Sequence, residues 1–186
     1  MSVKKAVFRV LYLRVLCLCG GLMAEQDSKE LIFSGITIYT DKNSTRAKKY
    51  FEKACGLNYS DGCVILGDIY HSGEGVTKNF KKAFEYYSKG CELNRALTCT
   101  LVGAFYREGY GVTKDLKQAF EYFDKACQLN NAKGCYALAT LYNEAKGVVK
   151  DEKQMTENLK KACGLGLKEA CDILKEQRYN GIKFYP

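Results

Sequence analysis

The chain of 186 residues is 47% hydrophobic and contains one proline and no tryptophan. This composition argues against a disordered chain and favours long helices around one core, because proline is the residue that helix interiors tolerate least. The formal charge of +8 falls to +4 without the first 24 residues, which hold four basic and no acidic side chains. The remaining basic residues are mixed with acidic ones, which is not the pattern of a nucleic-acid-binding protein.

The first 24 residues have the organisation of a signal peptide. A basic start precedes an apolar run from Val10 to Met23, and Ala24 then comes before a polar stretch. Arg14 inside the run opposes membrane insertion, which weakens the resemblance. We expect residues 1–24 to be removed after Ala24. Beyond that point no stretch approaches the ~18 apolar residues that a membrane span needs.

Eight cysteines mark an internal repeat of 36 residues. The first member of each pair is Cys55, Cys91, Cys127 or Cys163, and the second is Cys63, Cys99, Cys135 or Cys171. A period between about 20 and 50 residues is typical of stacked supersecondary units that bury their faces against their neighbours. The cysteine spacing therefore predicts an array of such units over residues 25–177.

The apolar spacing within one period predicts two helices, so the fold class is all-α. In the stretch 80–93 apolar residues recur three and four positions apart, and in 62–71 a second such stripe includes Gly67. Gly67 and Gly103 allow a neighbouring helix to approach closely. Asn79, Asp115 and Asp151 are the expected N-caps. We expect four helical hairpins, the first formed by a helix near 29–39 and a helix over 44–57, followed by a capping helix over 169–177 and a tail over 178–186.

The paired cysteines favour disulfide bonds between successive hairpins. Each pair joins the end of one helix to the start of the next across seven residues, and eight is an even number after signal cleavage. The repeated local environment favours pairing within each set of two, Cys55 with Cys63 being the first. Two alternatives remain, zinc ligation and free buried thiols, but zinc sites space their cysteines about two to four apart. We expect no metal and no cofactor.

Three helix positions change from repeat to repeat while most others stay constant. They hold Val64, Thr100 and Tyr136, then Asp68, Ala104 and Thr140, then His71, Arg107 and Asn143. Their spacing of i, i+4 and i+7 places them on one helical face, and a repeat protein needs such a varied face to read a ligand on its concave side. The alternative is an exposed surface whose residues differ between repeats because no function constrains them.

The turn Gly73-x-Gly75-Val76-x-Lys78, the aromatic pair Tyr86-Tyr87 and the cysteine spacing resemble the Sel1-like repeat. More narrowly, the chain resembles the Helicobacter cysteine-rich proteins. The resemblance implies a right-handed α-solenoid related to tetratricopeptide arrays, disulfides between repeats, and a secreted or periplasmic location. It also implies slow β-lactamase or penicillin-binding activity on β-lactam or peptidoglycan-like compounds, and antigens that meet host immune cells. The peptide or protein partner expected for the varied face therefore includes host-derived ligands.

The sequence assigns no catalytic residues to that activity. Serine β-lactamases use Ser-x-x-Lys with Ser-Asp-Asn and Lys-Thr-Gly, and none of these motifs occurs after Ala24. A zinc enzyme would need several histidines, and the chain has one, His71. Binding of a peptide or protein partner is therefore the preferred hypothesis, and β-lactam hydrolysis is the alternative.

Overall fold

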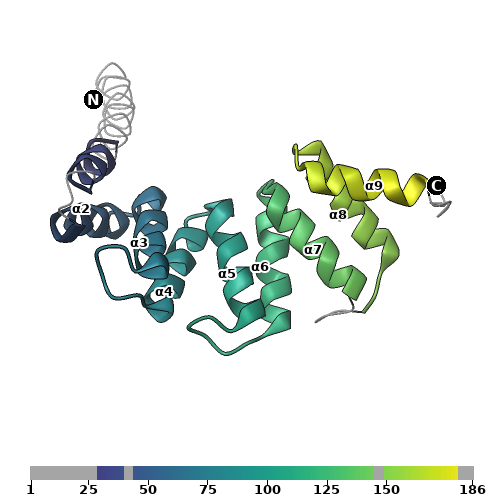
Figure 1. Cartoon of the computed structure of the whole chain (residues 1–186), viewed down its shortest axis with the longest axis horizontal. Coiled ribbons are helices and arrows are strands. Elements are labelled where there is room, and N and C mark those ends of the chain that lie inside the picture. Colours follow the sequence, from purple (N-terminus) through teal and green to yellow (C-terminus); the bar gives the residue numbers. More distant parts are fainter. Residues whose placement is uncertain (1–28, 40–43, 145–148, 180–186) are drawn as a thin grey trace, which may run out of the picture. The chain divides into compact units, whose positions relative to one another are not determined.

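The computed structural model describes residues 29–39, 44–144 and 149–179, and every regular element in these ranges is an α-helix (Figure 1). The first helix covers residues 29–39. It is followed by α2 (Ser44–Gly56), α3 (Ser60–Ser72), α4 (Phe80–Glu92), α5 (Ala96–Glu108), α6 (Leu116–Gln128), α7 (Ala132–Glu144), α8 (Glu152–Gly164) and α9 (Lys168–Tyr179). The all-α prediction is confirmed. The expected signal peptide lies outside the described residues, and α9 runs beyond the predicted end of the capping helix at Gln177.

The chain divides into two compact units, Met1–Gly62 and Cys63–Pro186. In the first unit the helix over 29–39 packs on α2, since a side chain at Gly35 would meet the ring of Phe51. The second unit contains most of α3 and all of α4 to α9. Within it each helix from α4 onward contacts the next one along the chain, and α5 also contacts α7. The second unit is therefore an array of helical hairpins stacked in sequence order.

The helices begin where the sequence predicts caps. The side chain of Asn79 accepts a hydrogen bond from the Lys82 amide, and Asp115 and Asp151 do the same at the starts of α6 and α8. Such caps satisfy amides that have no partner inside the helix. The three predicted N-caps are confirmed, so the boundary between each turn and the following helix is set locally.

Large and small side chains alternate between paired helices. A Cβ atom at Gly67 would collide with the Tyr87 ring, and one at Gly103 would lie 2.7 Å from the Phe123 ring. In the last hairpin Ala139 takes the glycine position and Leu159 the aromatic position, and both are buried in one cluster. Compared with the earlier hairpins, glycine is replaced by the larger alanine on one helix, and the aromatic residue that faces it is replaced by the smaller leucine. This compensation keeps the spacing of the helices similar from repeat to repeat.

The links between successive hairpins are short and cross-linked. Disulfides join Cys91 to Cys99, Cys127 to Cys135 and Cys163 to Cys171, with Cα atoms 4.6, 4.4 and 4.8 Å apart. Cys55 and Cys63 are also disulfide-bonded. Each link turns through a left-handed residue at one repeated position, which holds Asn58, Asn94, Asn130 and Gly166. Asparagine and glycine adopt this conformation more readily than other residues, so the turn is encoded together with the cysteines.

Candidate ligand-binding face

The nine varied residues lie on α3, α5 and α7, within the second unit, and we call them the variable face. All nine are exposed or half-buried, whereas the small and apolar residues between them are mostly buried. On α5, for example, Thr100, Ala104 and Arg107 are half-buried, while Val102 and Gly103 are buried. The set comprises Val64, Asp68 and His71 on α3, Thr100, Ala104 and Arg107 on α5, and Tyr136, Thr140 and Asn143 on α7.

Direct contact between α5 and α7 brings two parts of this face together. These helices occupy equivalent places in successive hairpins, so their varied residues form one surface that crosses the repeat boundary. The Thr100 hydroxyl lies 3.1 Å from the Asn131 side-chain oxygen, which belongs to the link before α7. Residues of one repeat therefore meet the next repeat at this face.

The α3 part of the face is tied to the core. The Tyr87 hydroxyl, which comes from α4, donates a 2.7 Å hydrogen bond to Asp68 Oδ1. Burial of the phenol, and next the hydrogen bond to Asp68, raise the pKa of Tyr87 well above its ordinary value. The equivalent pair in the next hairpin is Ala104 and Phe123, neither of which has a group to bond. Asp68 thus supplies the hydrogen-bond acceptor for a tyrosine of the core, which the sequence analysis did not predict.

His71, the chain's one histidine, also belongs to an aromatic cluster. Its ring centroid lies 5.5 Å from that of Phe80 and 5.8 Å from that of Phe105. Phe80 in turn stacks on Tyr110 with centroids 5.1 Å apart. These contacts hold the imidazole against the ends of two hairpins, which restricts the orientation in which it can meet a ligand.

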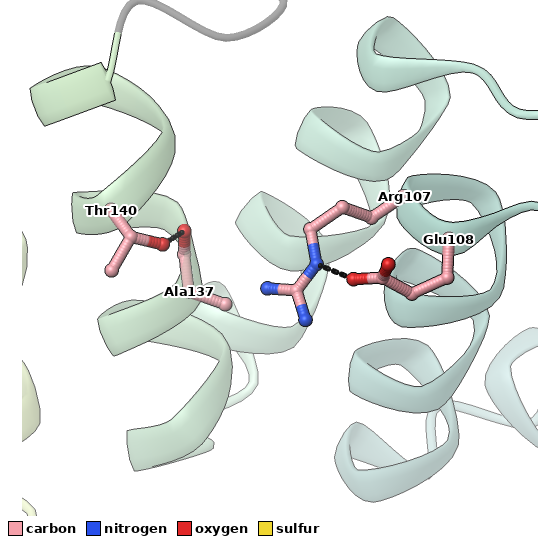
Figure 2. A network of polar contacts seen from close by, with 4 residues as sticks. All are labelled: Arg107, Glu108, Ala137 and Thr140. Atoms are coloured by element: carbon pink, nitrogen blue, oxygen red, sulfur yellow. Dashed lines mark hydrogen bonds and ion pairs between the residues drawn. The ribbon is translucent and has the colours of Figure 1, made fainter.

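The α5 part of the face carries a fixed cation. The Arg107 Nε group donates to Glu108 Oε1 at 2.7 Å, and the guanidinium carbon lies 5.8 Å from the centroid of the Phe123 ring. In Figure 2 the guanidinium lies on the side of α5 toward the helix that carries Ala137 and Thr140. Its two terminal nitrogens point away from Glu108, and among the described residues they have no hydrogen-bond acceptor.

The α7 part of the face is mainly neutral. The Thr140 hydroxyl donates to the Ala137 carbonyl at 2.6 Å, so its oxygen remains available to accept (Figure 2). Tyr136 is half-buried and Asn143 is exposed. Hydroxyl, phenol and amide groups on one face can donate to or accept from a peptide main chain.

The first unit contains a cavity that the sequence analysis also missed. It has a volume of about 540 Å³ and is lined by Lys29, Ile32, Phe33, Ile36, Asn58, Tyr59, Ser60 and Asp61. Gly35 lies against the ring of Phe51 in the same way that Gly67 lies against the ring of Tyr87. The sequence separation between glycine and aromatic residue is four residues shorter in the first pair. In this register Ile32 and Ile36 take the places of Val64 and Asp68. The 36-residue period concealed the match because the first hairpin turn is shorter.

Neither a metal site nor a membrane helix is found in residues 29–39, 44–144 and 149–179. No three His, Cys, Asp or Glu side chains come together there as metal ligands do. No helix in these ranges is long and apolar enough to cross a membrane. The disulfides are bonds that form and persist in an oxidising compartment.

Comparison with known families accounts for the array. The Sel1 repeat model matches residues 16–59, 60–94, 96–131 and 132–167, which is most of the chain. The solved structure of cysteine-rich protein B from Helicobacter pylori is 43% identical, with a TM-score of 0.57, and the alignment covers 69% of this chain and 92% of that one. The chain is a Sel1 repeat protein of the Helicobacter cysteine-rich family.

Other members of the Sel1 repeat group are similar over shorter or more distant stretches. HcpC of Helicobacter pylori is 58% identical over 77 residues, and the β-lactamase HcpA of the same species is 52% identical over 77 residues. Each match covers 41% of this chain, but only 26% of HcpC and 30% of HcpA. A protective antigen of uropathogenic Escherichia coli with an SLR fold has a TM-score of 0.75 at 26% identity, covering 87% of this chain and 36% of that one.

Proposed function

We propose that this Sel1 repeat protein is exported and binds a peptide or protein partner through the variable face of α3, α5 and α7. The observation that carries the proposal is the position of the nine varied residues. The cysteines and the small or apolar residues of these helices are mostly buried, whereas all nine varied residues are exposed or half-buried on helices that are equivalent in successive hairpins. A rigid array of this kind can hold an extended segment at little conformational cost, because its binding groups are already in place.

Export is supported by the disulfides and by the organisation of residues 1–24. If the chain is exported, its intact mass should correspond to a start near Glu25, and eight thiols should become alkylatable only after reduction. A full-length mass, or thiols that react without reduction, would contradict export. The same measurement leaves the binding proposal untouched, since it concerns the compartment and not the ligand.

Selection from random peptides tests the binding role. We expect the wild-type protein, immobilised with its disulfides intact, to enrich short random peptides displayed with free C termini. A face variant carrying Asp68→Asn, Arg107→Gln and Tyr136→Ala should lose this enrichment while its circular dichroism spectrum stays helical. Asp68→Asn keeps a side-chain oxygen that can accept from Tyr87.

A control variant should retain the enrichment. Lys81, Glu85 and Lys117 are exposed on α4 and α6 and lie outside the variable face. Their joint replacement by alanine removes a comparable number of polar groups from the other helices of the hairpins. Equal loss in both variants, or no loss in the face variant, would show that the face does not bind.

Slow β-lactam hydrolysis is a second candidate, favoured by the similarity to the β-lactamase HcpA. None of the serine β-lactamase motifs occurs after Ala24, and His71 packs against aromatic rings. Hydrolysis of nitrocefin by protein purified to constant specific activity would support this activity. If the activity separates from the protein on a further column, the assignment fails.

A further inference from the structure

We infer that Arg107 is a carboxylate-binding subsite of the variable face, so that the peptide partner bears an acidic group where it crosses from α5 to α7. The inference rests on the proposed function and specifies the chemistry of its ligand. It begins from the hydrogen-bonding capacity of the guanidinium, which has five N–H donors in a planar fork. Only the Nε donor has an acceptor among the described residues, Glu108 Oε1 at 2.7 Å.

The orientation of Arg107 is restricted before any ligand arrives. Glu108 holds the Nε edge, and the guanidinium carbon lies 5.8 Å from the centroid of the Phe123 ring, a buried residue of α6. These two contacts favour one orientation of the guanidinium, which reduces the side-chain entropy that Arg107 loses on binding. The terminal nitrogens thereby point away from Glu108, on the side of α5 toward α7 (Figure 2).

The side chains that precede and face Arg107 are short. Ala104 precedes Arg107 by one turn on α5, and the facing helix offers Ala137 and Thr140 (Figure 2). The Thr140 proton is directed to the Ala137 carbonyl at 2.6 Å, so the hydroxyl does not compete as a donor for an anion. The equivalent position on α3 is different, because His71 lies against Phe80 and Phe105.

The remaining edge of the guanidinium and the nature of the ligand indicate a carboxylate. With Nε engaged by Glu108, the edge formed by the two terminal nitrogens matches the bidentate geometry of a carboxylate or a phosphate. An unmodified peptide carries carboxylates and no phosphate, so the bound group is the side chain of an aspartate or a glutamate, or the peptide C terminus.

The test uses the full disulfide-bonded protein and the peptides enriched in the selection. Each peptide is resynthesised in three forms: unchanged, with its acidic side chains replaced by amides, and with an amidated C terminus. Binding is measured by fluorescence anisotropy to wild type, to Arg107→Gln and to Lys117→Gln. The last is a matched control that makes the same charge change at an exposed residue of α6.

We expect the enriched peptides to share an acidic group and Arg107→Gln to weaken their binding by about tenfold or more, with Lys117→Gln near wild type. Removing the decisive carboxylate should weaken binding to wild type by a similar factor and have little further effect on Arg107→Gln. The form that loses affinity distinguishes a side-chain from a C-terminal carboxylate. Arg107→Lys should fall between, because it keeps the charge but loses the fork.

Two results would overturn the inference, and only the second would also refute the proposed binding function. Peptides that bind through the variable face without an acidic group, or whose carboxylate matters equally in wild type and Arg107→Gln, would refute the subsite and leave the binding role intact. A selection that enriches no peptide at all would refute the proposed function, and the subsite would fall with it.

Discussion

The α3 and α5 parts of the variable face look equivalent in the sequence but differ in what surrounds them. On α3, Asp68 accepts from the core residue Tyr87, and His71 packs on two aromatic rings. On α5, Ala104 makes no polar contact, and Arg107 keeps two terminal nitrogens without an acceptor among the described residues. Variation on α3 therefore includes compensation for a change in the core, whereas variation on α5 leaves the terminal nitrogens of Arg107 available for the proposed ligand.

The largest expected effect comes from breaking the covalent link between the two hairpins. Replacing Cys91 and Cys99 by serine removes the disulfide that joins α4 to α5. In the chain-entropy view, loss of this short closed loop should lower the free energy of unfolding by about 2–3 kcal/mol. Urea denaturation of the double variant and wild type, both exported to the same compartment, measures the difference. If the free energy of unfolding changes by less than about 0.3 kcal/mol, helix packing without the disulfide is sufficient to hold α4 against α5.

The Asp68 and Tyr87 pair should behave as one unit in stability. Asp68→Ala leaves a buried phenol hydroxyl without its acceptor, which should cost about 1–3 kcal/mol. The double variant Asp68→Ala with Tyr87→Phe should recover most of this loss, because the next hairpin already uses Ala104 with Phe123. A double-mutant cycle measured by urea unfolding gives the coupling directly. Strict additivity of the two changes would contradict the structural role of Asp68.

Alkaline pH should separate wild type from Tyr87→Phe. The folded pKa of Tyr87 is raised by burial and by Asp68, so above pH ~10 the unfolded phenol loses its proton while the folded one keeps it. The unfolded state then binds fewer protons than the folded state, and the free energy of unfolding falls as the pH rises. Wild type should lose stability between pH 10 and 12 more steeply than the variant. Parallel profiles would refute the assigned pKa shift.

The smallest stability effect is expected at Arg107. Its ion pair with Glu108 is well exposed, at 40% and 42% of the two side chains, and exposed pairs contribute little. Arg107→Gln should change the free energy of unfolding by less than ~0.5 kcal/mol. Thermal unfolding followed by circular dichroism is sufficient to detect a larger change. A substantial loss of stability would show that Arg107, like Asp68, supports the fold. The α3 and α5 parts of the variable face would then not differ in the way described above.

Much of the fold could be read from the spacing of a few residue types. Cysteines eight apart, repeated every 36 residues, predicted the local disulfides that the second unit contains. Asn79, Asp115 and Asp151 marked helix starts, and Gly67 and Gly103 marked close approach of neighbouring helices. These features are local or strictly periodic, so one repeat explains the others.

The register of the first hairpin could not be read in this way. Gly35 and Phe51 are 16 residues apart, whereas Gly67 and Tyr87 are 20 apart. A strict 36-residue comparison therefore aligns the wrong residues and conceals the cavity beside Ile32 and Ile36. The match becomes visible only when the glycine is seen against the aromatic ring that it accommodates.

Helix length, caps, turn residues and disulfide partners depend on neighbours within a few positions, and for this protein the chain specifies them without reference to its packing. The fate of a surface residue depends on side chains that arrive from other helices. Asp68 is paired because Tyr87 reaches it from α4, and Arg107 is held because Phe123 lies beneath it on α6. Packing therefore determines which varied residues support the core and which remain free to meet a ligand.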